Sequence, residues 1–381
     1  MAVSFQQSHE LAQAVDSVNS FGIAIYRELA AEQPGQSFFF SPSSIAFALA
    51  MTLQGAAGET ADELAQALCG DCRPEAFHRA MAALFESTNN SSVELRLANR
   101  LWGQAGYEFL PAFLEATERY GARLAELDFK NDAEAARATI NPWVSEQTRG
   151  NINELLGMGS VDELTRLIVT NAAYFLGTWE AEFEELETQV EPFWVTSSES
   201  VELPLMHQVD RFSYGEFPKL KALEMSYRRG STMCVFLPNE RDGLHTIEAE
   251  LTTARLREWL FNKTKIVVIT LPKFRVRSGT SLREVLKNLG IQRALDPAAA
   301  DFSNATTDPA GLVVSEVLHQ AFVNVDEKGT EAAAATAVCL SFAGCAPPEP
   351  PGVFRADHPF LFLIRDRTTK LIHFMGRFTG A

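Results

Sequence analysis

One short segment near the C-terminus restricts the possible folds of this chain more than any other feature. Residues 329–336 read Gly-Thr-Glu-Ala-Ala-Ala-Ala-Thr, with small side chains, one charge and no proline. Such a segment can lie exposed as a loop, and it can also enter a β-sheet between two existing strands, because no bulky group prevents this. A short alanine-rich helix is the competing interpretation, since alanine has the highest helix propensity.

The two-residue period of a β-strand separates the side chains of this segment by charge. If a strand continues from Gly329, one face is uncharged and holds Thr330, Ala332, Ala334, Thr336, Val338, Leu340 and Phe342. The only charge, on Glu331, falls on the opposite face together with Ala333 and Ala335. Insertion of this strand would therefore bury no ion in the core. The prolyl stretch at 347–352 lacks the N–H groups that a ladder requires, so insertion must stop before it.

Several blocks of sequence, in a fixed order over about 340 residues, resemble the serpin family. The blocks that carry the resemblance are FFSPSSI at 39–45, INPWV at 140–144, TNAAYF at 170–175, GTWE at 177–180, LPKF at 271–274, EKGTEAAAAT at 327–336, FRADHPF at 354–360 and FMGRF at 374–378. The resemblance implies an α+β fold with three β-sheets, about nine helices and an exposed reactive-centre loop at about residues 327–353. It also implies one domain over residues 1–381, which agrees with an apolar content of 46% and the absence of a low-complexity linker before the loop.

Apolar periodicity and β-branched content locate the main elements. Helices are expected at residues 11–29, 43–55, 59–68, 111–120 and 132–148. Strands are expected at residues 166–175, 234–237, 265–271, 316–325, 360–365 and 371–378.

The resemblance implies a suicide-substrate inhibitor of serine endopeptidases. A protease cleaves the loop and forms an acyl-enzyme, after which the released segment inserts into the opening sheet and traps the enzyme. About 12 to 15 inserted residues at roughly 1 kcal/mol per hydrogen bond, with three large apolar side chains at about 2 kcal/mol each, give on the order of 15 to 20 kcal/mol. No nucleophile elbow, phosphate loop, dinucleotide fingerprint or HExxH motif is present, so the chain itself is not expected to be an enzyme.

The position of the scissile bond depends on loop length. The common family spacing from Gly329 places it between Ala343 and Gly344, and Phe342, Gly344 and Cys345 are alternatives to Ala343 because the loop is longer than in many relatives. No lysine or arginine occurs between Gly329 and Phe354, so a trypsin-like protease finds no cation for its acidic specificity pocket. Elastase-like or chymotrypsin-like targets are expected, and a cysteine protease is left open.

If the sheet opens after cleavage, the contacts between its strands must keep it closed beforehand and still be able to break. We call such contacts a latch. Carried over residue by residue from the resemblance, Ser41, Ser44, Asn171 and His319 correspond to the family's polar cluster beneath that sheet, and Trp179 corresponds to the tryptophan at its top. A hydrogen-bonded core histidine is the simpler interpretation of His319, and it is compatible with a latch.

No cofactor or metal is expected, and the chain is expected to be a monomer. The net charge of −16 disfavours nucleic acids and anionic membranes as partners. A heparin-like cofactor is not expected either, since the region 73–90 carries only Arg73 and Arg79 as fixed positive charges. Cys69 and Cys72 have the spacing of metal ligands, but no second Cys or His pair accompanies them.

The polar N-terminus, without a signal-peptide core, predicts a cytoplasmic protein, or a secreted one if a signal was removed. Five cysteines, an odd number, suit a reducing compartment. Cys339 and Cys345 both lie in the loop, and we hypothesise that oxidation joins them and prevents insertion. Equal inhibition with and without a thiol reductant would reject this switch.

Two other functions remain open at this point. A non-inhibitory binding or chaperone protein would keep the fold without insertion, and a plain protease substrate would be cut without trapping. The small side chains at 330–336 favour insertion and therefore inhibition.

Overall fold

A computed structural model of the chain describes residues 5–70, 72–90, 94–120, 124–260, 263–308, 311–330 and 350–380. The α-helices within these ranges are α1 Phe5–Glu32, α2 Pro42–Gly55, α3 Gly58–Cys69, α4 Pro74–Asn90, α5 Pro111–Glu118, α6 Phe129–Gln147, α7 Leu244–Glu250, α8 Thr253–Trp259 and α9 Arg283–Asn288. Two mixed sheets, each with parallel and antiparallel pairs, complete the α+β fold that the sequence predicts.

The six-stranded sheet contains the longest parallel pairing. Its strands follow the order β10 Phe274–Ser281, β11 Val314–Asp326, β12 Gly329–Thr330, β4 Leu167–Thr178, β2 Glu94–Gln104 and β3 Ala125–Leu127. β11 and β4 pair directly and in parallel from Val314 and Leu167 to Phe322 and Tyr174. Beyond this point β12 lies between them and pairs antiparallel with both.

The nine-stranded sheet combines two of the three sheets that were expected. Its strands are β1 Phe38–Phe40, β15 Ile372–Phe378, β14 Phe360–Asp366, β8 Ser231–Pro238, β7 Leu220–Ser226, β6 Ser200–Glu216, β9 Lys263–Pro272 and β13 Gly352–Arg355, with β5 Gln189–Trp194 paired to β6. The 17-residue strand β6 pairs with β7 near one end and with β9 over most of its length. It therefore joins the part of the sheet that contains β7 to the part that contains β9.

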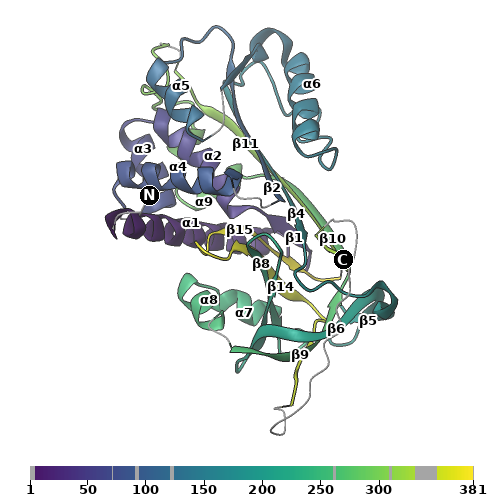
Figure 1. Ribbon diagram of the computed structural model, residues 1–381. Coiled ribbons are helices and arrows are strands. Elements are labelled where there is room, and N and C mark those ends of the chain that lie inside the picture. The colour runs from purple at the N-terminus through teal and green to yellow at the C-terminus, as the bar shows by residue number, and fades with distance from the viewer. Residues whose placement is uncertain are drawn as a thin grey trace.

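The helices cover the six-stranded sheet unequally. In Figure 1 the helices α1 to α5 and α9 gather on one side of the long strands β2, β4 and β11, whereas α6 lies alone on the other side. Helix α2 is buried around almost its whole circumference, as expected for an apolar helix in the centre of a protein. One hydrophobic core lies between helices α1 to α5 and the sheets. A second core, rich in phenylalanine, lies where the six-stranded sheet packs against the nine-stranded sheet.

The predicted elements are present, with ends that mostly shift by three residues or fewer; the helix predicted at 11–29 is longer, because α1 already begins at Phe5 and ends at Glu32. The strand expected at 316–325 is β11, and that expected at 166–175 is β4, extended to Thr178. The helix expected at 43–55 is α2, which begins at Pro42 after the cap residue Ser41. In the part of the chain that the structure describes, no helix combines the length and the apolar character needed to cross a bilayer.

Candidate functional site

The top of the six-stranded sheet already contains the first two residues of the hinge. Gly329 pairs with Thr178 of β4 and Asp326 of β11, and Thr330 pairs with Gly177 and Val325. The Thr330 side chain is fully buried. The two flanking strands are therefore separated at this end and joined directly only below it.

Gly329 occupies a backbone conformation that requires glycine. Its φ is +144°, which is unfavourable for residues with a Cβ. A Cβ at this position would also collide with the carbonyl oxygen of Gly177 on the neighbouring strand. The chain can turn into the sheet here only because residue 329 has no side chain.

Trp179 closes the top of the sheet immediately after β4. Its backbone N–H donates to the carbonyl oxygen of Lys328 at 2.9 Å, and its indole N–H donates to that of Asp326 at 3.0 Å. The indole ring stacks on Tyr227 with centroids 4.3 Å apart. The Tyr227 hydroxyl in turn lies 2.9 Å from the Thr330 hydroxyl. Trp179 and Tyr227 together hold the residues that lead into the hinge.

Glu327 anchors the turn between β11 and β12. Its carboxylate pairs with the Lys273 ammonium at 2.7 Å and accepts a hydrogen bond from the Thr188 hydroxyl at 2.7 Å. Burial acts to raise the pKa of Glu327, but the hydrogen bonds from Lys273 and Thr188 outweigh it and lower the pKa. The carboxylate is thus ionised and fixed at neutral pH, which restrains the start of the hinge.

A buried polar cluster lies lower down, beneath the pairing of β11 with β4. His319 of β11 and Asn171 of β4 are direct partners in the parallel register, and the His319 Nδ1 is hydrogen-bonded to the Asn171 Oδ1. The Asn171 Nδ2 donates to the Ser44 Oγ at 2.8 Å. The Ser41 backbone N–H donates to the His319 Nε2 at 3.0 Å, and the Ser41 Oγ caps α2 at Ser44. The four residues carried over from the resemblance therefore meet in one network.

The network determines which nitrogen of His319 carries the proton. Because Nε2 accepts from Ser41, it has no hydrogen, and the proton of the neutral ring must lie on Nδ1, where it is donated to Asn171. Burial lowers the pKa of His319 to about 3. Protonation would place a second N–H against the Ser41 N–H, so the ring remains neutral over the physiological pH range.

Two members of the cluster were not predicted from the sequence. Asn99 of β2 pairs in register with Asn171, accepts from the Ser44 hydroxyl at 2.9 Å and donates to the Ser44 carbonyl oxygen at 3.3 Å. The carbonyl oxygen of His373 accepts from the Ser41 hydroxyl at 2.7 Å. The signal for Asn99 was an amide residue within an otherwise strand-like run at 94–104, whereas a backbone carbonyl gives no sequence signal.

Helix α6 covers the opposite face of the same strand pair. Leu318 of β11 and Ile168 of β4 lie in a buried cluster with Ile140 and Val144 of α6. A strand inserted between β11 and β4 would have to pass under this helix and disrupt these contacts.

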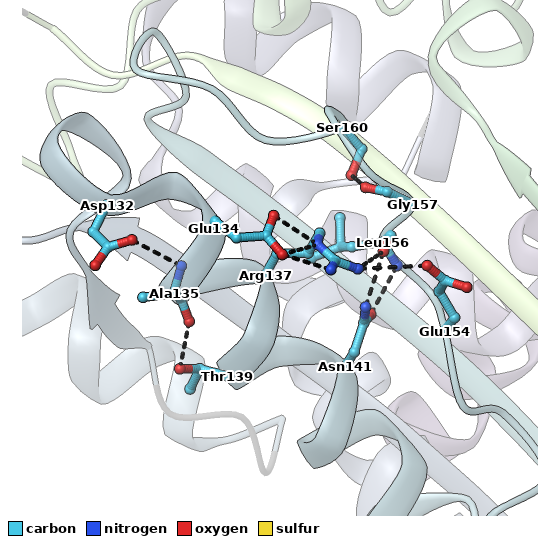
Figure 2. A network of polar contacts seen from close by, with 10 residues as sticks. All are labelled: Asp132, Glu134, Ala135, Arg137, Thr139, Asn141, Glu154, Leu156, Gly157 and Ser160. Carbon is cyan, nitrogen blue, oxygen red and sulfur yellow. Dashed lines mark hydrogen bonds and ion pairs between the residues drawn. The ribbon is translucent and has the colours of Figure 1, made fainter.

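The segment after α6 is tied back to the helix by two side chains (Figure 2). The Arg137 guanidinium pairs with Glu134 at 2.6 Å and with Glu154 at 3.4 Å. The Asn141 Oδ1 accepts from the backbone N–H groups of Leu155 and Leu156 at 3.0 and 2.8 Å, and its Nδ2 donates to the Leu156 carbonyl oxygen at 2.9 Å. These contacts fix the segment at 154–156 to helix α6.

Part of the predicted site lies outside the described residues. These positions are the hinge residues Glu331, Ala332, Ala333, Ala334, Ala335 and Thr336, the reactive-bond candidates Phe342, Ala343, Gly344 and Cys345, and Cys339. Among the described cysteines, Cys69, Cys72 and Cys234 are free thiols. In the same ranges no group of three or more His, Cys, Asp or Glu side chains is arranged to hold a metal ion.

Comparisons with known proteins agree on one family. A family model described as "Serpin (serine protease inhibitor)" matches residues 16–380. "Leukocyte elastase inhibitor A" of Rattus norvegicus is 39% identical over 378 residues, which cover 96% of this chain and 99% of the relative. "Serpin B8" of Homo sapiens is 38% identical, with 95% of this chain and 97% of the relative covered.

Solved structures give the same result for the fold. Uncleaved ovalbumin superimposes with a TM-score of 0.86 at 28% identity, over 96% of this chain and 100% of the other. Human thyroxine-binding globulin superimposes with a TM-score of 0.88 at 28% identity, over 97% of this chain and 99% of the other.

Proposed function

The chain belongs to the serpin family of serine protease inhibitors, and from this premise we propose that it is a suicide-substrate inhibitor of elastase-like or chymotrypsin-like serine endopeptidases. The observation that carries the proposal is the position of Gly329 and Thr330 between β11 and β4. The hinge enters the sheet at the place where a further strand would follow.

The insertion has a defined path and a defined obstacle. Residues that follow Thr330 would separate β11 from β4, which are now paired directly at eight positions from Val314 to Phe322. This exchange breaks the bond between His319 and Asn171 and replaces one parallel pairing with two antiparallel ones. The number of backbone hydrogen bonds rises, and antiparallel pairing is slightly more stable per residue. Insertion is therefore favourable once cleavage releases the loop.

The covalent step belongs to the protease. Its serine attacks the carbonyl carbon at the reactive bond, and the new amino terminus leaves, so that an acyl-enzyme remains on the N-terminal side of the cut. Movement of that side into the sheet carries the enzyme with it, while the deacylation step is prevented. The chain itself contributes the cleavable loop and the favourable free energy of strand insertion. It acts as an inhibitor, not as an enzyme.

Target class is proposed from the loop residues and the relatives. Ala343 suits the small specificity pocket of elastase-like enzymes, and Phe342 would suit a chymotrypsin-like pocket. Relatives named leukocyte elastase inhibitor support the first of these. We also propose a reducing compartment, because the described cysteines are free thiols.

A denaturing gel after incubation with elastase, chymotrypsin and trypsin tests the proposal. We expect a covalent band with elastase or chymotrypsin and none with trypsin. Clean cleavage without such a band would instead identify a plain substrate, and an uncut loop would identify a non-inhibitory binding protein. Mass spectrometry of the released C-terminal fragment would identify the reactive bond.

A further inference from the structure

Three neighbouring strands of the nine-stranded sheet carry valines in one row, of which the outer two are exposed and the middle one, Val268, is half-buried. Val209 of β6 pairs with Val268 of β9, and Val268 pairs with Val353 of β13. Residues paired across strands point to the same face of a sheet. Val209 is 63% exposed and Val353 is 51% exposed, and Ile266, two residues from Val268 on the same strand, is 41% exposed. We call these four residues the valine row.

The side chains next to the valine row are polar, and they form hydrogen bonds and ion pairs with one another. On one side, His207 pairs with Glu191 at 2.6 Å and is hydrogen-bonded to the Thr270 hydroxyl at 3.2 Å, and Arg355 pairs with Asp357 at 2.9 Å. An apolar centre next to a polar rim is the usual anatomy of a protein interface. Single exposed apolar residues are common on protein surfaces, whereas contiguous apolar patches are typical of interaction sites.

The valine row is held in place before any partner arrives. The Val353 carbonyl oxygen accepts hydrogen bonds from the Lys221 ammonium at 3.0 Å and the Tyr214 hydroxyl at 3.1 Å, and the next residue, Phe354, is fully buried. A rigid apolar surface loses little conformational entropy on binding, which favours association.

The row adjoins the C-terminal end of the reactive-centre loop. Strand β13 begins at Gly352, so residues 344–352 separate it from the bond after Ala343. Nine residues span at most about 30 Å when fully extended. A protease domain of about 200 residues has a radius of gyration of roughly 16 Å, and hence a diameter of roughly 40 Å. The reactive bond therefore lies less than one protease diameter from β13, so a protease bound at this bond can reach the valine row.

We propose that the valine row is a docking surface for the serine protease that attacks the loop, a second contact that accelerates formation of the encounter complex. The inference rests on the proposed inhibitory function. Its partner is a protease with an apolar surface beside its active-site cleft, and its effect is on association, before acylation and insertion.

Val209→Asp tests the docking surface, with Val190→Asp as the matched control. Val190 lies on β5 of the same sheet and is 70% exposed, and it is outside the valine row. Both variants add the same charge, so a general change in electrostatic steering affects them equally. With elastase or chymotrypsin, we expect Val209→Asp to lower the second-order rate constant of inhibition at least about fivefold relative to Val190→Asp, a change that lies within the roughly one to three decades over which association rates vary among mutants of one interface.

The stoichiometry of inhibition and the melting temperature should be unchanged in Val209→Asp. Ile266→Ser provides a second variant that removes apolar area without adding a charge, and it should also slow inhibition. Equal rate constants for Val209→Asp, Val190→Asp and the parent protein would reject the docking surface while leaving the inhibitory function intact. A raised stoichiometry with an unchanged rate would also reject it, since the residue would then act on insertion. Absence of any covalent complex in the parent protein would overturn both proposals.

Discussion

The hydroxyl groups of Tyr227 and Thr330 lie 2.9 Å apart in the interior, between residues that are 103 positions apart in the chain. Thr330 belongs to the hinge, and Tyr227 stacks on Trp179 at the top of the six-stranded sheet. The contact therefore joins the part of the chain that is proposed to move to the part that stays in place.

Tyr227→Phe should loosen the hinge while leaving the fold intact. The substitution removes one hydroxyl and leaves that of Thr330 buried without its partner, at a cost of about 1 to 3 kcal/mol. Hydrogen exchange of the backbone amides at 325–330 should become faster, while exchange in β14 and β15 serves as the internal control. Unchanged exchange at 325–330 would show that the hydroxyl pair does not restrain the hinge.

His319→Ala should destabilise the intact protein more than the loop-cleaved protein. In the intact sheet, the substitution removes a partner of Asn171 and of the Ser41 N–H, which costs about 1 to 3 kcal/mol for each buried group left unsatisfied. After insertion the two strands are apart, so the bond between His319 and Asn171 no longer contributes. The fall in melting temperature of the two forms measures this difference, and equal falls would contradict the latch.

Stability should decrease as the pH falls below about 6.5. Burial lowers the pKa of His319 to about 3 and the pKa values of His373 and His78 to about 4. Below pH 6.5 the unfolded chain binds protons at these histidines while the folded chain does not, so acid favours unfolding. The contribution is complete above pH 6.5 and is progressively lost as the pH falls toward 4. Melting temperatures at pH 7.5, 6.0 and 5.0 should show this decrease, and His319→Gln should make it less steep.

Cleavage of the loop should raise the melting temperature. A cut between Leu340 and Cys345 frees the hinge, and the inserted strand adds two ladders of hydrogen bonds to the six-stranded sheet. The gain of on the order of 15 kcal/mol exceeds the whole stability of many domains. Differential scanning calorimetry before and after cleavage with elastase provides the measurement. An unchanged melting temperature would be incompatible with insertion.

Ala334→Arg should convert the inhibitor into a substrate, and Glu331→Arg should not. The strand period places residue 334 on the face that becomes buried and residue 331, which already carries a charge, on the opposite face. Only the first substitution would bury an unpaired charge on insertion, and this would slow insertion enough for the acyl-enzyme to hydrolyse. The ratio of covalent complex to cleaved protein on a denaturing gel distinguishes the two variants. Retention of the complex in Ala334→Arg would count against the face assignment.

The sequence was sufficient where short-range patterns determine the structure. Runs rich in Val, Ile and Phe predicted β4 and β11, and the apolar run at 43–55 predicted α2. It was insufficient for the irregular strand β6, which is 17 residues long, half exposed and mostly without alternation. The expected third sheet is merged into the nine-stranded sheet, because β6 pairs with β7 near one end and with β9 along most of its length. The sequence does not reveal where one pairing ends and the other begins.

The resemblance to the family, the small side chains of the hinge and the lack of a cation in the loop follow from residue type and order alone. The folded structure was needed to show that Thr330 lies inside the sheet, that Asn99 joins the polar cluster and that Val209, Val268 and Val353 lie in one row on the same face of a sheet. These depend on strand register, and register is set by contacts between residues far apart in the chain.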